Sequence, residues 1–354
     1  MKAVQEIAGP ALVLSDAKLD ILNAKTTHGL LRGSQRFDVL AVIDRKFAGQ
    51  DAGEVMDGKK RDIPIFAKVG EAIASLDQKP VYCVIGVATS GGYLPPSLKK
   101  DIQEAIQAGL SIVNGLHYFL NDDPILAPLA QEYSVDLYDI RKPRPRAELQ
   151  FWTGEILHLK IPRIAVLGMD CAVGKRTTAK FLTDLCEEKG LRAEMIFTGQ
   201  TGWMQGYRYG LFFDAMVNDF IGGEIEKAIL DCARETQAEV IFIEGQSALR
   251  NPSGPCGSEF ILSGGAKGVI LQHVPGRKYY EDTKVAIPPV ESEIQLIEHY
   301  GAKVLALTLN EGEMEAEELR KYQEDLRSRL SIPAIRPLNE GFYSLVQRTD
   351  RRNA

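Results

Sequence analysis

The residues best suited to chemistry lie in one stretch, RIAVLGMDCAVGKRTT at positions 163–178. An apolar run ends in a loop bounded by Gly168 and Gly174, and Lys175 follows just before a helical pattern. The backbone N–H groups of such a loop point inward, the helix dipole adds positive potential, and the lysine supplies a full charge. The order of strand, loop, lysine and helix therefore predicts a cradle for a phosphorylated ligand. Its expected binding residues are Gly168, Asp170, Cys171, Ala172, Val173, Gly174, Lys175, Arg176, Thr177 and Thr178.

The spacing differs from that of the commonest phosphate loop. Five residues separate Gly168 from Gly174 instead of four, and Arg176 stands where a Ser or Thr hydroxyl normally binds Mg²⁺. The form G-x-D-x-x-x-G-K resembles dethiobiotin synthetase. Two interpretations stay open: Thr177 supplies the metal ligand, or the loop holds a diphosphate without metal-assisted phosphoryl transfer. No metal ligand is certain, and Thr177 and Glu244 are the candidates if magnesium is used.

Length and composition narrow the class of protein. The chain has 354 residues, enough for two domains, and its formal net charge of −6 argues against a nucleic-acid or anionic-membrane partner. No apolar run approaches the roughly 18 residues that span a bilayer. The five cysteines are scattered and have no C-x-x-C spacing, which predicts free thiols in a reducing cytoplasm. A symmetric homo-oligomer that acts on a small molecule is the expected form.

Apolar runs alternate with helical patterns along the whole chain, which predicts an α/β protein with parallel sheets. The basic, proline-rich segment RKPRPR at 141–146 cannot continue a strand or helix. The predicted domains are therefore residues 1–150 and 151–354, the second carrying the phosphate loop. The expected strands are 11–14, 39–44, 63–66, 81–88, 111–113, 136–140, 164–167, 193–198, 240–244, 268–273, 303–309 and 334–335. The expected helices are 69–76, 98–108, 177–188, 217–232, 290–299 and 313–330.

Three residues are candidates for acid–base catalysis. Glu244 ends the apolar run EVIFIEG, where phosphate-loop proteins orient Mg²⁺ or water, although a strand-terminal glutamate facing solvent is the alternative. His273 also ends an apolar strand, where it could act as a base or be a structural histidine. Asp214 flanks a helix start, so a helix-capping role competes with a catalytic one. Cys171 could be reactive, but a small packing residue is the simpler interpretation.

The expected substrate-binding residues are of two kinds. Gln200 and Thr201 lie in TGQTGWMQG, an uncharged, glycine-rich stretch after a strand, which could close over a ligand or be a flexible surface loop. Arg250, Arg277 and Lys278 could receive substrate carboxylates. Lys25, His28 and His117 in the first half could reach the site or simply end strands.

The whole chain resembles the D-glutamate N-acetyltransferase family, long catalogued as a domain of unknown function. The segments that carry the resemblance span roughly residues 20–310: AKTTHGLLR (24–32), AVIDRKFAGQDAGEV (41–55), GGYLPP (91–96), NGLHYFLNDDP (114–124), GMDCAVGKRTT (168–178), TGQTG (198–202) and IEGQS (243–247). The resemblance implies a Rossmann-like N-terminal domain, a P-loop C-terminal domain, and acetyl transfer from acetyl-CoA to the amine of D-glutamate. The chain departs from the family pattern at 247–265, where it reads SALRNPSGPCGSEFILSGG.

Three functions are compatible with these residues. The leading one is an acetyltransferase whose phosphate loop holds the diphosphate of acetyl-CoA. The second is an ATP- and Mg-dependent ligase or kinase similar to dethiobiotin synthetase. The third is a nucleotide-binding protein without turnover.

Overall fold

The computed structural model describes residues 7–341, and it divides them into two compact units. The first unit contains the residues up to Arg144 together with Gln200–Arg208. The second contains Pro145–Gly199 and the described residues from Tyr209 onward. The predicted boundary after residue 150 did not anticipate that Gln200–Arg208 belong to the first unit, in which residues 200–205 form a buried helix.

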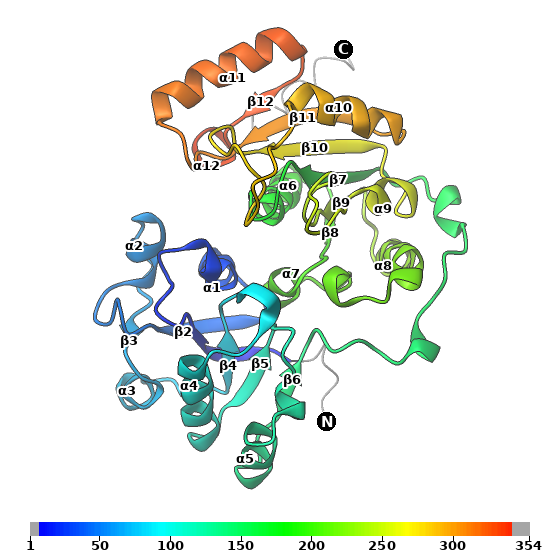
Figure 1. Cartoon of the computed structure of the whole chain (residues 1–354). Helices are drawn as coiled ribbons and strands as arrows, with labels where there is room; N and C mark the ends of the chain where they lie inside the picture. The colour runs from blue at the N-terminus through cyan, green and yellow to red at the C-terminus, as the bar shows by residue number, and fades with distance from the viewer. Residues whose placement is uncertain (1–6, 342–354) are drawn as a thin grey trace. The chain divides into compact units, whose positions relative to one another are not determined.

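The first unit is built on a six-stranded parallel sheet of order β3-β2-β1-β4-β5-β6 (Figure 1). This order reverses between β1 and β4, as in Rossmann folds. The strands are β1 (Gly9–Leu14), β2 (Phe37–Ile43), β3 (Ile65–Phe66), β4 (Tyr82–Ile85), β5 (Ser111–Asn114) and β6 (Leu137–Asp139). The helices are α1 (Lys25–Leu31), α2 (Ala52–Asp57), α3 (Val69–Ser75), α4 (Pro96–Gln107), α5 (Leu126–Glu132) and α7 (Gln200–Gln205).

The helix α7 belongs to the first unit because its side chains bond there. All six of its residues are buried. Gln205 donates through Nε2 to the carbonyl oxygens of Gly29 and Gly33, and the guanidinium of Arg36 lies 4.0 Å from the centre of the Trp203 ring. Of the two alternatives left open for 198–206, the flexible surface loop is therefore wrong for residues 200–205. The glycine and polar residues of this segment are not typical of a helix, but tertiary contacts stabilise a helix there.

The second unit also contains a six-stranded parallel sheet, of order β12-β11-β10-β7-β9-β8. Its strands are β7 (Arg163–Gly168), β8 (Ala193–Ile196), β9 (Val240–Glu244), β10 (Gly268–His273), β11 (Lys303–Leu309) and β12 (Ala334–Ile335). Its helices are α6 (Lys175–Glu188), α8 (Ile221–Glu235), α9 (Ser258–Leu262), α10 (Val290–His299), α11 (Ala316–Leu330) and α12 (Pro337–Glu340). The chain leaves β7 toward β8 on one side and later crosses to β10 on the other, so the order reverses beside β7.

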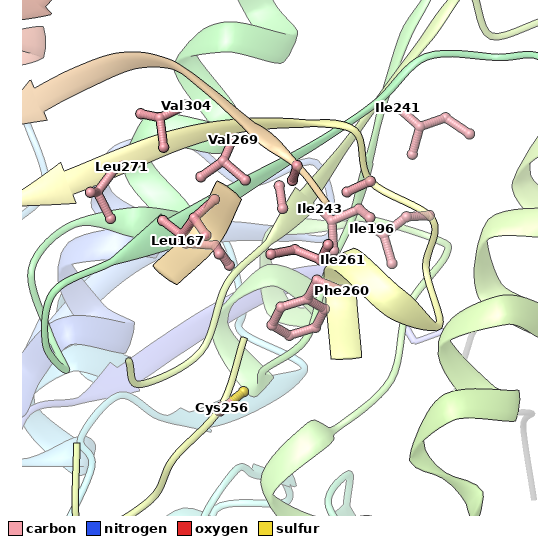
Figure 2. Close-up of a cluster of buried hydrophobic side chains, with 14 of the residues drawn as sticks. Leu167, Ile196, Ile241, Ile243, Cys256, Phe260, Ile261, Val269, Leu271 and Val304 are labelled. Carbon is pink, nitrogen blue, oxygen red and sulfur yellow. The ribbon is translucent and has the colours of Figure 1, made fainter. Parts of the chain in front are cut away.

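Alternation along the strands of the second sheet assigns each side chain to a face. Leu167, Ile243 and Leu271 join one buried core with Phe260 of α9 (Figure 2). Residues of α8, α10 and α11 complete that core. Because successive side chains in a strand point to opposite faces, Gly168, Glu244 and Gln272 belong to the other face, which α6 covers.

The expected fold class is confirmed. Five strands of the second sheet begin or end at the predicted residues, because each is an apolar run with polar or glycine residues at its ends. The predictions missed α1, α2, α5, α7, α9 and α12, which are all short. No helix among residues 7–341 is both long and apolar enough to cross a bilayer.

Candidate active site

The phosphate loop is built as its sequence predicts. β7 ends at Gly168, α6 begins at Lys175, and the loop between them turns through left-handed conformations at Ala172 (φ 51°) and Gly174 (φ 108°). Glycine is required at 168 because an added Cβ would lie 2.8 Å from Val173 Cγ2 and 3.0 Å from Lys175 Cδ. The aliphatic part of the Lys175 side chain therefore lies directly against Gly168, at the end of β7. This is the geometry of a helix N-terminus prepared for an anion.

Two carbonyl oxygens hold the ammonium group of Lys175. Its Nζ donates to Asp170 O at 2.6 Å and to Ser247 O at 2.8 Å, and the residue is only 7% exposed. Ser247 also accepts from the thiol of Cys171 at 3.3 Å through its Oγ. Neutral carbonyl oxygens are weaker partners for an ammonium than phosphate oxygens. The buried cation is therefore placed where an incoming phosphate could take over its bonds.

Asp170 anchors the loop to other segments of the second unit. Its carboxylate accepts from Asn251 Nδ2 at 3.0 Å, from Arg277 Nη1 at 3.0 Å and from the backbone N–H of Glu281 at 2.8 Å. Burial alone would lower the pKa of the Arg277 guanidinium, but its bonds to Asp170 and Glu313 raise it. The loop is thereby tied to two neighbouring segments, one after β9 and one after β10.

Two of the three expected carboxylate receptors are already paired with carboxylates. Arg277 bonds Asp170 and Glu313, and Arg250 donates to Glu293 Oε2 at 2.7 Å. Burial raises the pKa of Glu293, and Arg250 partly offsets this. Lys278 is exposed beside Arg277. The role of these three cations in substrate binding stays a prediction, but two of them hold the loops of the site together.

Glu244 lies on the same face of the sheet as α6, and it is 6% exposed. Its Oε2 accepts from the backbone N–H of Thr198 at 3.0 Å, and its carbonyl accepts from the Thr198 hydroxyl. Asp214 is exposed in the short turn Phe213–Ala215, which joins Thr198 through the bond from Phe213 N to Thr198 O. The structure therefore brings the Asp214 turn to the strand end that carries Glu244.

His273 does not share the face of the sheet that carries Glu244. Its neighbour Gln272 accepts from the Thr178 hydroxyl beneath α6, so the side chain of His273 points to the opposite face. There its Nε2 lies 3.2 Å from the hydroxyl of Tyr322 on α11, and its Nδ1 is buried without a partner. Strand alternation argues against His273 as the base at the phosphate loop.

The environment of His273 has a consequence for pH dependence. Burial lowers the pKa of His273 to about 4, and the charge of Glu291 opposes this shift only weakly. Between pH 6.5 and pH 4 the imidazole of His273 is protonated in the unfolded chain but stays neutral in the folded chain. The free energy of unfolding should therefore fall by about 3 kcal/mol as the pH drops through this range. The test compares urea unfolding of the wild type and His273→Gln across that range. We expect a flatter profile for the variant, and parallel profiles would contradict the assignment.

Sequence reasoning missed the polar residues that support the loop. Gln272 Oε1 accepts from Thr178 at 2.6 Å and from Thr308 at 2.7 Å, and Asn310 donates to the carbonyl of Val173 at 2.9 Å. A glutamine inside the apolar strand 268–273 was the available signal. Ser247 could not be found in this way, because it lies in an irregular segment. Asn251 drew attention beside Arg250 as a possible contact for a substrate carboxylate, but its bond to Asp170 was not expected.

No group of three or more His, Cys, Asp or Glu side chains in the described part of the chain is arranged to hold a metal ion. Thr177 is half-buried near the start of α6, and Glu244 is the last residue of β9, which pairs with β7. The magnesium hypothesis, which would also use phosphate oxygens and water, stays a prediction.

Comparison with known proteins now places the chain in a family. Residues 150–346 match the P-loop domain, and residues 45–143 the Rossmann-like domain, of a family described as a domain of unknown function, DUF1611. The chain belongs to the DUF1611 family. The expected resemblance is confirmed, and so are the Rossmann-like and P-loop domains.

Relatives of this DUF1611 chain carry a functional name. Proteins from Pseudoalteromonas sp. and Tritonibacter scottomollicae, each named D-glutamate N-acetyltransferase, are 30% and 28% identical to it over 271 residues. Each alignment covers 74% of this chain and 79% of the relative. A crystal structure of a DUF1611 family protein from Anabaena variabilis superposes with a TM-score of 0.87 at 28% identity, covering 96% of this chain and 98% of the other.

Proposed function

We propose that this chain is an N-acetyltransferase that moves the acetyl group of acetyl-CoA to the amine of an acidic amino acid, with D-glutamate as the first acceptor to test. The observation that carries the proposal is the phosphate loop, in which buried Lys175 is followed by Arg176 instead of a magnesium-binding hydroxyl. The names of the two relatives support acetyl transfer.

The loop suits the diphosphate of coenzyme A. The diphosphate carries two negative charges. It takes no part in the bond changes of acetyl transfer, so it needs no metal ion to activate it. The N–H groups at the start of α6, the ammonium of Lys175 and the guanidinium of Arg176 supply donors and positive charge for it. In this proposal the diphosphate displaces the carbonyl oxygens of Asp170 and Ser247 from Lys175.

The chemistry requires a base and donors for an oxyanion. The acceptor amine must lose a proton before its nitrogen attacks the thioester carbon, which forms the C–N bond and places negative charge on the carbonyl oxygen. As that intermediate collapses, the nitrogen gives up its second proton, the C–S bond breaks, and coenzyme A leaves as a thiolate that takes up a proton. Glu244 is the proposed base because it is a buried carboxylate on the face of the sheet that α6 covers. Asp214 is the alternative, in the adjoining turn.

One observation favours a second function. Glu244 ends the strand next to β7, which is the place of the acid that orients Mg²⁺ in many phosphate-loop enzymes. An ATP-dependent ligase or kinase would use Glu244 and Thr177 in that way. The two functions differ in the ligand they require, so one set of binding measurements separates them.

The experiment measures binding of coenzyme A, acetyl-CoA and ATP, each with and without Mg²⁺, by calorimetry, and thiol release from acetyl-CoA in the presence of D-glutamate. We expect magnesium-independent binding of coenzyme A and thiol release that depends on the acceptor. Arg176→Thr restores the hydroxyl of the common motif. This variant should bind coenzyme A about tenfold more weakly, because it loses a charge-assisted contact.

The opposite pattern would overturn the proposal. If the wild type binds ATP only with Mg²⁺, hydrolyses it, and neither binds coenzyme A nor releases thiol with any amino acid, the ligase function replaces acetyl transfer. Lys278→Ala is the control for general loss of positive charge, because Lys278 is an exposed cation of the same unit. It should leave coenzyme A binding unchanged.

A further inference from the structure

The second unit has a cavity of about 480 Å³ at the amino ends of β7, β10 and β11. Arg163, Gly268 and Lys303 are the first residues of these strands, and all three line the cavity. The phosphate loop follows Gly168 at the other end of β7, roughly 16 Å away at 3.3 Å per residue. The cavity is therefore separate from the candidate active site.

The floor of the cavity is apolar. Gly268 leaves room for Leu305, because an added Cβ would lie 2.7 Å from Leu305 Cδ1 and 3.5 Å from Ile164 Cγ1. Ile164 and Leu305 are thus brought close together at the start of the sheet. The other apolar side chains that line the cavity come from the segment before β7, namely Leu159, Ile161 and Pro162.

The exposure of Leu305 has a structural cause. The pairing of β10 with β11 shifts by one residue between Val269 and Ile270, so that Leu305 is an extra residue on β11. Such a bulge redirects a side chain. Leu305 is 39% exposed although it lies inside a strand. The strand therefore presents an apolar side chain to the cavity that a ligand could cover.

The remaining charged residues of the cavity are all cations. Lys160, Lys267 and Lys303 are exposed, and in the described part of the chain none of them forms an ion pair. Arg163 lines the cavity as well, and its guanidinium donates to backbone carbonyl oxygens. No Asp or Glu among residues 7–341 lines the cavity. Four cations thus gather around an apolar floor, in a chain whose net charge is −6.

This combination suits a ligand that is apolar along its body and anionic at one end. An alkyl chain on the floor would remove apolar surface from water. A carboxylate at its end would be attracted by the ammonium groups, whose flexible stems let them reach it. The surface of an anionic membrane suits the chain less well, because the net negative charge of the protein repels it.

We propose that the cavity binds a single-chain anionic amphiphile of the fatty-acid class. Its alkyl chain lies on Ile164 and Leu305, and its carboxylate lies beside Lys160, Lys267 and Lys303. The proposal goes beyond acetyl transfer and does not depend on it, because both the ligand and the residues differ.

The test measures binding of octanoate, decanoate and dodecanoate to the full chain by calorimetry, at concentrations at which these carboxylates stay monomeric. We expect the affinity to rise about two- to fourfold for each added methylene group, since each one buries further apolar surface. Decyltrimethylammonium has the chain of decanoate with the opposite charge. It should bind about tenfold more weakly or worse, because the lysines repel it.

Leu305→Glu places a carboxylate on the floor of the cavity, at a position exposed enough to tolerate it. Decanoate should bind about 20-fold more weakly or worse, because the new charge repels its carboxylate and is poorly solvated beneath an alkyl chain. Leu191→Glu is the matched control. Leu191 is 44% exposed between α6 and β8 and does not line the cavity, so this variant should bind decanoate as the wild type does.

Lys267→Gln/Lys303→Gln tests the charged part of the site. Decanoate should bind about fivefold more weakly, because two attractive charges are lost. Lys79→Gln/Lys284→Gln removes the same charge from two exposed lysines outside the cavity and should leave binding unchanged. Since all four lysines are exposed, these variants should fold, and they keep the test decisive if Leu305→Glu is unstable.

Several results would overturn the site. These are a wild type that binds none of the three carboxylates, decyltrimethylammonium that binds as tightly as decanoate, or folded cavity variants with wild-type affinity. Binding to vesicles of anionic phospholipid without binding of monomeric decanoate would assign a membrane surface instead. A smaller assembly for Leu305→Glu in sedimentation, without decanoate binding to the wild type, would assign a contact between copies of the chain.

Discussion

Replacing Lys175 by methionine is expected to lower kcat/KM for acetyl-CoA by about 100- to 1000-fold, the range seen when one preorganised electrostatic contact is removed. Methionine keeps the length of the aliphatic stem that crosses Gly168 but loses the ammonium. Binding of coenzyme A should weaken with it, since in the proposed function the same charge holds the diphosphate in the ground state. Steady-state thiol release and calorimetry measure the two effects.

The control for Lys175→Met lies on the same helix. Lys180 pairs with Asp184 one turn further on, in a contact that is partly exposed to solvent. Lys180→Met should change kcat/KM less than twofold, because a surface pair of this kind contributes little. If Lys175→Met binds coenzyme A with wild-type affinity, the phosphate loop does not hold the acetyl donor. Acetyl-CoA would then have to bind at another site.

The second domain could be largely predicted because its signals are local. The strands 240–244 and 268–273 are apolar runs that end in Glu244 and His273, and the structure gives them the same bounds. The phosphate loop was predictable for the same reason, since glycine, lysine and the following helix are adjacent in the sequence. Neighbouring residues alone decide such features.

The partners of the site's cations could not be predicted in this way. Arg277 meets Asp170 across 107 positions of sequence, and Arg250 meets Glu293 across 43. Only the order of the strands in the sheet brings these pairs together. That order cannot be predicted from the local pattern of a single sequence. The arginines therefore resembled free receptors for a substrate.

The helix at 200–205 could not be predicted for a different reason. Its composition favours a loop, but α7 gains more from burial of Trp203 and from the bonds of Gln205 than local preference costs. Tertiary contacts of this kind override propensity. They also explain how a stretch between two strands of the second unit comes to belong to the first.

Removal of the Asp170–Arg277 pair is expected to have the largest effect on stability. Asp170 is 1% exposed and the Arg277 side chain 10%, so either partner is left as a poorly solvated charge when the other is lost. Asp170→Ala and Arg277→Met should each lower the free energy of unfolding by about 3–5 kcal/mol. The double variant should lose less than the sum of the two, with a coupling of about 2 kcal/mol or more.

Urea unfolding of the four proteins in this cycle measures the coupling directly. Arg234→Gln is the control, because Arg234 meets Glu155 where both side chains are largely exposed, and it should cost less than about 1 kcal/mol. The loss of Asp170 should also weaken coenzyme A binding, since the carboxylate holds the loop to Asn251 and to Glu281. Additive losses in the cycle, or an Asp170→Ala protein as stable as the wild type, would mean that the ion pair does not hold the loop. In that case the glycine backbone, the bonds of Lys175 and the bond from Asn310 to the carbonyl of Val173 would have to define the shape of the cradle.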